Sequence, residues 1–299
     1  MNRPLKLSVF ALLLMGGSFA FAQETTQPAN EPVLFKRTFT NGLVEKYVVT
    51  SQISSNTDLS SVGQDVQSMN FDTSMDATYT YSNVKEDGSA LLTFLFNNIK
   101  MKAEGPMAEM MGQMGDQTPK EIKGTQTVNP FFKITNTKME TANSSMMQMM
   151  GGNNISEIFA FVAFPTKAVA IGDTWEADVP SMGGMFEKGA KMTGKFVGAG
   201  EIGDKKVWNL QFTGKPKMTI DIGKMMAENP NQGESGMPPM NILMEGTTSM
   251  LIKVAVDQTT FQILSVDSAS ETDGKVKLVD MGMEFPSTGQ QVSKIVVKK

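Results

Sequence analysis

The sequence of 299 residues contains no cysteine and no histidine. Without cysteine there is no disulfide framework, no thiolate nucleophile and no iron–sulfur cluster. Without histidine there is no Ser-His-Asp triad, no common type of zinc site and no imidazole base. Basic residues are also few, with 27 lysines and arginines against 31 acids, which argues against a nucleic-acid-binding protein and its basic face. These absences favour a protein that is not an enzyme, and no cofactor is expected.

The first 22 residues have the features of a secretory signal peptide. Arg3 and Lys6 form a basic start, an apolar run covers residues 7–15, and the tripeptide Ala20-Phe21-Ala22 fits a cleavage site. The apolar run is too short to cross a bilayer comfortably. We therefore expect cleavage after Ala22, no transmembrane anchor after that cleavage, and an exported protein that is periplasmic or extracellular.

Residues 23–32 are polar and rich in proline, and are predicted to form a disordered leader. Residues 33–299 are predicted to form a single β-rich domain. Strand-like segments recur there between turn sequences such as Asn41-Gly42, a pattern typical of antiparallel hairpins. The predicted fold class is mainly β, with an antiparallel curved sheet or half-barrel of consecutive hairpins. The expected strands cover residues 33–40, 43–53, 77–81, 89–102, 128–139, 191–200, 205–212, 247–256, 261–270, 275–285 and 291–297.

One central apolar helix is predicted at residues 155–164. Asn154 can cap it, Glu157 follows at capping-box spacing, and Pro165 ends it. Because the segment is apolar on nearly every side, we expect it to be buried against the sheet. This helix would join two similar halves, at about residues 33–150 and 165–299. Weaker helical patterns cover residues 107–114 and 222–228.

Methionine is unusually frequent, with 26 residues, and two segments rich in glycine and proline, at 103–120 and 229–240, are predicted to be long Met-containing surface loops. Soft thioether sulfur can hold Cu(I) or Ag(I) without histidine or cysteine. Methionine also fills gaps in a core or lines an adaptable apolar surface, and its spread over many segments favours that interpretation. The candidate metal ligands are Met107, Met110, Met111, Met114, Met146, Met147, Met149 and Met150.

A short motif covers residues 164–175, which read Phe-Pro-Thr-Lys-Ala-Val-Ala-Ile-Gly-Asp-Thr-Trp. The order of Pro165, Val169 and the turn Gly172-Asp173-Thr174-Trp175 resembles a motif in a family of exported bacterial proteins of unknown function. The order of elements over residues 33–272 is similar as well. The resemblance implies an all-β exported domain with a curved sheet over a helix, and it implies no activity.

Four aromatic residues are the candidates for a ligand site. Gly172-Asp173 predicts a turn, after which Trp175 enters a strand and buries its ring, although a tryptophan that faces a ligand is the functional alternative. A curved sheet crossed by a helix can enclose an apolar cavity, and Phe159, Phe161 and Phe164 would line it. The other interpretation of these phenylalanines is an ordinary filled core.

The leading hypothesis is a non-enzymatic binding or envelope-interaction protein with an apolar, Met- and Phe-rich surface or cavity. Its partner would be an apolar small molecule or another envelope protein. The first alternative is a soft-metal binder that holds Cu(I) or Ag(I) through loop methionines. The second is a carboxylate-dependent hydrolase, although the acids of the sequence are not distinguishable from solvated surface acids. No phosphate-binding loop or nucleotide fingerprint is present.

Overall fold

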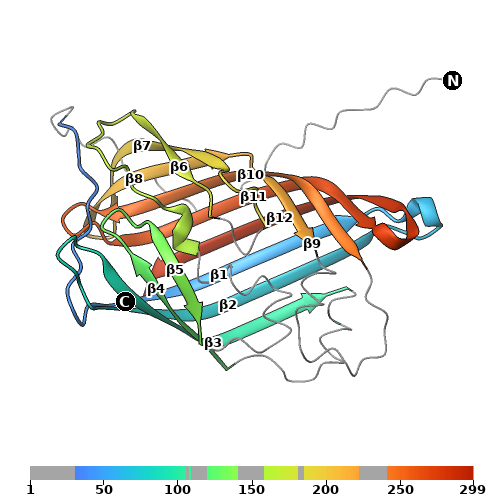
Figure 1. Ribbon diagram of the computed structural model, residues 1–299, viewed down its shortest axis with the longest axis horizontal. Helices are drawn as coiled ribbons and strands as arrows, with labels where there is room; N and C mark the ends of the chain where they lie inside the picture. Colours follow the sequence, from blue (N-terminus) through green and yellow to red (C-terminus); the bar gives the residue numbers. More distant parts are fainter. Residues whose placement is uncertain are drawn as a thin grey trace.

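The computed structural model describes residues 31–105, 108, 120–140, 158–180, 185–221 and 241–298, which form one large twelve-stranded sheet (Figure 1). The strands are β1 (Val44–Thr57), β2 (Gln67–Ser82), β3 (Ala90–Glu104), β4 (Glu121–Val128), β5 (Ile134–Met139), β6 (Thr174–Asp178), β7 (Lys191–Ile202), β8 (Lys205–Gly214), β9 (Lys217–Asp221), β10 (Ile242–Asp257), β11 (Ile263–Leu278) and β12 (Met283–Val297). Short 3₁₀ turns are η1 (Ser60–Val62), η2 (Ile158–Phe161) and η5 (Val279–Met281).

The strand order is β5-β4-β3-β2-β1-β12-β11-β10-β8-β7-β6, and β9 pairs with the part of β10 that β8 does not reach. Most strands therefore lie antiparallel beside their neighbours in the sequence. The pairing that joins the two halves is that of β12 with β1, from Tyr47 opposite Val297 to Thr57 opposite Ser287. The predicted mainly β, antiparallel curved sheet is confirmed, and its two halves form one sheet. The sheet is not closed, and β5 and β6 are its edges.

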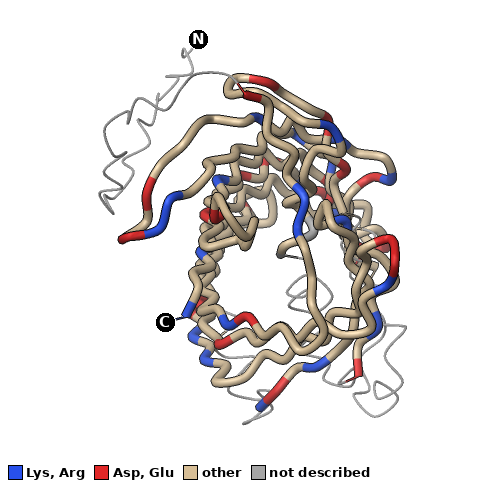
Figure 2. The backbone as a smooth tube through the Cα atoms, turned by 90° about the vertical axis from the view of Figure 1, so that its left-hand side faces the viewer, with Lys and Arg blue, Asp and Glu red and all other residues tan. Residues whose placement is uncertain are grey.

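The sheet curls about the long direction of its strands, so that it has a concave face and an outer face (Figure 2). Successive side chains of a strand point to opposite faces. The strand register therefore places odd-numbered residues of β1, β2 and β12 on the concave face, together with even-numbered residues of β10 and β11. This alternation decides which side chains meet inside the curved sheet.

The hydrophobic core covers the concave face at the end where β1 begins and β12 ends. There the ring of Phe159 lies 5.2 Å from the rings of both Tyr47 and Tyr79, measured between centroids. Phe35 contacts Phe164 and other aromatic rings of the same core. The apolar face of a sheet needs a second layer to bury its side chains. Two segments form that layer here: residues 33–43, which we call the arm, and residues 158–170.

The prediction of a central helix at residues 155–164 is wrong. Residues 155–157 lie outside the described residues, η2 is a single 3₁₀ turn, and residues 162–164 continue as irregular chain. The backbone N–H of Phe164 donates to the carbonyl oxygen of Phe131 at 2.9 Å, and the carbonyl oxygen of Ala163 accepts a bond from the indole N–H of Trp175 at 3.2 Å. In a helix over residues 155–164, the N–H of Phe164 would instead pair with the carbonyl oxygen four residues earlier. The apolar composition predicted burial, but the segment fills the core without a helix.

The predicted strand at residues 33–40 is also wrong, although a turn is present at residues 41–42. Residues 33–40 form one isolated β-bridge, between Val33 and Val169, and the N–H of Arg37 donates to the carbonyl oxygen of Pro130 at 2.8 Å. The side chains of the arm alternate between buried and exposed positions because one side of the arm faces the core, and this alternation explains the strand-like sequence pattern. The buried side chains are Phe35, Arg37 and Phe39.

Several other strand boundaries differ from the prediction. β4 was not expected, and the predicted strand at 128–139 divides into the end of β4, a turn and β5. The side-chain oxygen of Asn129 makes that turn by accepting bonds from the N–H groups of Phe131 and Lys133, at 3.0 and 2.9 Å. The predicted strand at 275–285 is divided by η5, so its two parts belong to β11 and β12.

The signal peptide at residues 1–22 and most of the leader at 23–32 lie outside the described residues, and stay predictions. The same holds for nearly all of the loops at 103–120 and 229–240, and for the weak helices at 107–114 and 222–228. Within the described ranges, no helical segment has both the length and the apolar character that a membrane-crossing helix requires.

Candidate functional site

The charged side chains of the long central strands are segregated on the outer face. Ion pairs run across that face, such as Lys275 with Glu284 at 2.7 Å and Lys277 with Glu245 at 2.6 Å. On the concave face of β1, β2, β10, β11 and β12, the register leaves Glu45 as the one charged residue of these strands. The concave face is therefore almost uncharged.

Glu45 is neutralised by a buried cluster of donors. Its carboxylate forms an ion pair with the guanidinium of Arg37, and both side chains are buried. The hydroxyl groups of Tyr47 and Tyr81 donate to the same carboxylate at 3.0 and 2.9 Å. Arg37 also donates to the carbonyl oxygen of Thr260. Burial and the negative charge of Glu45 raise the pKa of Tyr47 and of Tyr81 well above the usual value. These contacts hold the arm, through Arg37, against β1 and β2.

Sequence reasoning did not identify this cluster, although a signal was present. Arg37 stands between Phe35 and Phe39 at the inward positions of an alternating segment. An arginine at such a position needs a buried anionic partner, because an unpaired buried charge is strongly unfavourable. The nearest acid at an inward strand position is Glu45, eight residues later.

Beyond the core, the concave face of the three central strands carries mainly hydroxyl-bearing side chains, together with Gln291 and the apolar Ile53. We call the polar residues among them the hydroxyl floor: Ser51, Ser55 and Thr57 of β1, Ser287, Gln291 and Ser293 of β12, and Ser268, Ser270 and Thr272 of β11. The hydroxyl oxygens of Ser51 and Ser293 lie 2.9 Å apart. The side-chain amide of Gln291 donates to both, at 3.4 and 3.2 Å. Most of the floor is half-buried, and Gln291 is exposed.

Apolar side chains flank the hydroxyl floor on both sides. We call them the methionine walls: Met69 and Phe71 of β2 with Met101 of β3 on one side, and Met244 and Met250 of β10 with Met218 and Ile220 of β9 on the other. All of them except Phe71 are half-buried. Long, unbranched methionine side chains adapt to irregular apolar shapes. The floor and the walls together are the candidate functional site.

The aromatic residues predicted to bind a ligand lie in or beside the core. Phe159, Phe161 and Phe164 are buried in it. Trp175 is half-buried at the β6 edge, where its ring meets that of Phe212 edge-on at 5.6 Å and borders a hollow of about 380 Å³ between β6, β7 and β8. The Gly-Asp-Thr-Trp turn is thus formed and its tryptophan packs as a structural residue. Ligand binding by any of the four stays a prediction.

The predicted metal ligands cannot be placed in the fold. Met107, Met110, Met111, Met114, Met146, Met147, Met149 and Met150 all lie outside the described residues, so the soft-metal site stays a prediction. In the part of the chain that the structure describes, no group of three or more acids, histidines or cysteines is placed to hold a metal ion.

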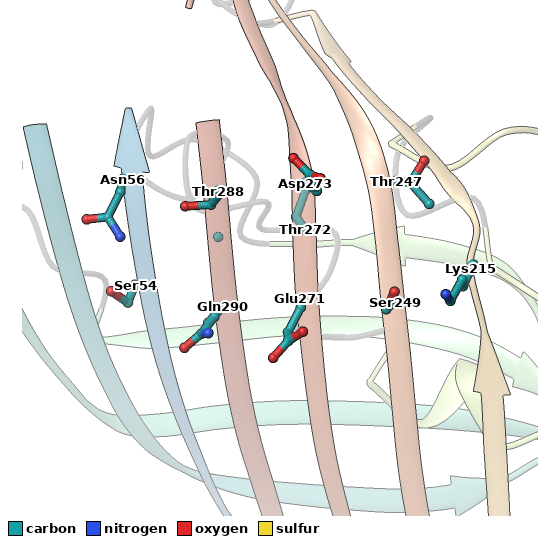
Figure 3. A pocket seen from close by; sticks show the side chains of 11 residues that line it. Ser54, Asn56, Lys215, Thr247, Ser249, Glu271, Thr272, Asp273, Thr288 and Gln290 are labelled. Atoms are coloured by element: carbon teal, nitrogen blue, oxygen red, sulfur yellow. The ribbon is translucent and has the colours of Figure 1, made fainter. Parts of the chain in front are cut away.

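A polar hollow of about 520 Å³ lies on the outer face, across β1, β12, β11 and β10 (Figure 3). Its side chains form two rows that follow the strand register. One row consists of Ser54, Gln290, Glu271 and Ser249, and the other of Asn56, Thr288, Asp273 and Thr247. Beside it β10 and β11 approach closely at Gly246 and Gly274, where a Cβ on Gly274 would lie 2.2 Å from a backbone oxygen. This hydrophilic hollow is separated from the methionine walls by the thickness of the sheet.

No family model and no curated protein matches the chain. A solved structure described as lipid–protein interactions in lipovitellin gives a TM-score of 0.49 at 11% identity, over 87% of this chain and 25% of that one. An outer-membrane channel from Pseudomonas putida F1 gives a TM-score of 0.24 at 8% identity, over 90% of this chain and 100% of that one. The chain thus spans about a quarter of the lipovitellin chain. Both scores are too low to carry information on function.

Proposed function

We propose that this protein is a non-enzymatic, exported binding protein that holds an apolar small molecule on the concave face of its sheet. The observation that carries the proposal is the composition of that face beyond the core. On the described central strands it has no charge, and its methionine walls stay half-buried. Met218 and Met250 pack against the edge of the core, whereas the other half-buried wall residues, Met69, Met101, Met244 and Ile220, lie beyond it. Contiguous apolar surface that reaches solvent is typical of a binding surface.

The chemistry of the concave face supports binding without catalysis. General acid–base catalysis needs a group that exchanges a proton near the working pH. Glu45 is engaged by Arg37 and by two tyrosine hydroxyl groups. The tyrosines themselves are held in their protonated form, because burial and the carboxylate raise their pKa. Among the described central strands, the concave face therefore offers hydrogen bonds and apolar contact, and no proton-transfer group.

The proposal is tested by titrating the mature protein with a neutral solvatochromic dye such as Nile red. In Met250→Asp, a charge is placed on a half-buried wall position. We expect this variant to weaken dye binding at least about tenfold, because a tenfold change corresponds to only about 1.4 kcal/mol. Native mass spectrometry of the protein purified from its own compartment would show a co-purifying ligand directly.

The matched control is Val292→Asp, which places the same charge on the outer face of β12, where the side chain of Val292 is 55% exposed. We expect this variant to bind the dye within about twofold of the unaltered protein. Circular dichroism and thermal melting check that both variants are folded. The proposal is refuted if the unaltered protein binds no dye, or if the two aspartates weaken binding equally.

A further inference from the structure

Resting on the function proposed above, we infer that the ligand is an uncharged amphipathic molecule, with its polar group held by Ser51, Ser293 and Gln291 and its apolar chain against the methionine walls. The polar group would be an alcohol or an amide, each of which both donates and accepts hydrogen bonds. We call the three residues the polar trio. Apolar contact alone does not discriminate among apolar molecules. The polar trio would select those that also carry an uncharged polar group.

The hydrogen-bonding capacity of the trio matches a neutral group. Each serine hydroxyl has one hydrogen and two acceptor lone pairs. The contact between Ser51 and Ser293 uses one hydroxyl hydrogen, so the second stays free to donate. The amide nitrogen of Gln291 is engaged with both hydroxyl oxygens, while its carbonyl oxygen stays free to accept. The trio thus presents one donor and one acceptor side by side, as an alcohol or an amide requires.

A charged head group would fit poorly. A carboxylate only accepts hydrogen bonds and an ammonium group only donates them, so either would leave half of the trio unmatched. Neither would find a countercharge, because the one charged residue on this face of the central strands, Glu45, is already paired with Arg37. Moving an ion from water to such a surface without a partner is strongly unfavourable.

The position of the trio suits a molecule with an apolar chain. The register places Gln291 in the middle of a row across five adjacent strands, with Ile53 and Ser270 as its neighbours. Phe71 and Met250 end the row, two strands away on either side. Because neighbouring strands are about 4.8 Å apart, each wall lies roughly 10 Å from the trio. A polar group at the trio therefore leaves an attached alkyl chain within reach of a wall.

The test compares molecules with one alkyl chain and different head groups, by displacement of Nile red from the mature protein at neutral pH. The series consists of monolauroylglycerol, dodecanol, laurate and dodecyltrimethylammonium. We expect the two neutral compounds to bind at least about tenfold more tightly than either ion. In Gln291→Leu, and in the triple variant with Ser51→Ala and Ser293→Ala, this preference should fall below about threefold, while dye binding persists.

Gln290→Leu is the matched control, because Gln290 is the next residue of β12 and lies on the outer face. It should keep the full preference for neutral compounds. If the triple variant does not fold, the exposed single variant Gln291→Leu still decides the question. Equal binding of all four compounds, or tighter binding of an ion, overturns the inference and leaves the proposed function intact. Failure of the dye and of every compound to bind refutes the proposed function itself.

Discussion

The three tyrosines of the chain predict that the protein unfolds at high pH. Tyr47, Tyr79 and Tyr81 all lie on the concave face of β1 and β2, and each is about 2% exposed. Burial raises the pKa of all three, and the charge of Glu45 raises it further. In the unfolded chain the same side chains lose their protons near pH 10, at about the usual tyrosine pKa. Above that pH the folded protein therefore binds more protons than the unfolded chain.

The sign and the size of the effect follow from proton linkage. Stability falls as pH rises wherever the folded form holds the extra protons, so the contribution is fully present below about pH 10 and is lost above it. One pKa unit corresponds to about 1.36 kcal/mol for each group. Three tyrosines therefore lower the free energy of unfolding by about 4 kcal/mol for each pH unit above 10. A protein that is stable by about 5–15 kcal/mol should then unfold roughly one to four pH units higher.

The assay is urea unfolding at a series of alkaline pH values, with tyrosinate absorbance and near-ultraviolet circular dichroism followed together. We expect tyrosinate to form only in the unfolding transition. In Tyr79→Phe, one of the three groups is removed, so the slope should fall to about 2.7 kcal/mol per pH unit. The reasoning is refuted if a tyrosine ionises near pH 10 while the circular dichroism spectrum stays that of the folded protein.

Two further predictions concern packing. Glu45→Leu should lower the free energy of unfolding by about 3–5 kcal/mol because it leaves the buried guanidinium of Arg37 unpaired, and adding Arg37→Met should recover most of that loss in urea unfolding. The expectation is contradicted if the double variant loses as much free energy of unfolding as Glu45→Leu and Arg37→Met lose separately, added together. Gly194→Ala should cost about 1–3 kcal/mol in the same assay, because its methyl carbon would lie 2.3 Å from the ring of Trp175. In the control Gly200→Ala the new methyl meets chiefly the end of a movable asparagine side chain, and an equal loss there would show that the ring contact is not the cause.

The strands could be predicted because their signals are local. Alternating side chains and turn pairs such as Gly203-Asp204 place β7 and β8 within two residues of their observed bounds. The pairing of β12 with β1 had no such signal, because it joins residues about 240 positions apart and depends on the curvature of the whole sheet. The sequence therefore predicted hairpins, but not that the last strand returns to the first.

The errors have a common physical cause. Residues 33–40 alternate like a strand and residues 155–164 are apolar like a buried helix, yet both are layers that cover the concave face. Their side-chain patterns are set by the surface that they cover, while their backbone groups bond to other segments, as Phe164 does to Phe131. Composition alone does not distinguish a covering segment from a regular element.

Part of the candidate site was predictable, and part was not. Flexible methionine side chains on an apolar binding surface were expected, but their expected location was in loops, and the walls of the described fold come from strands. The hydroxyl floor had a local signal, since Ser51, Ser55 and Thr57 alternate in one strand. The alternation alone does not say which face of the sheet these hydroxyls occupy. The strand register decides it, because a shift of one residue would move them to the outer face.

The length of the central strands gives a second reason, beside the composition of the concave face, to connect this face with function. β2, β10 and β11 each have 16 residues, against about five or six in an average strand. The core uses only one end of β1: Tyr47 and Val49 are buried in it, whereas Ser51, Ile53 and Ser55 continue along the same face half-buried. Ordering these extra residues costs roughly 1–2 kcal/mol each in backbone entropy, and they bury little apolar surface in return. Strand length beyond the needs of the core is therefore better explained by the ligand that we propose for this face.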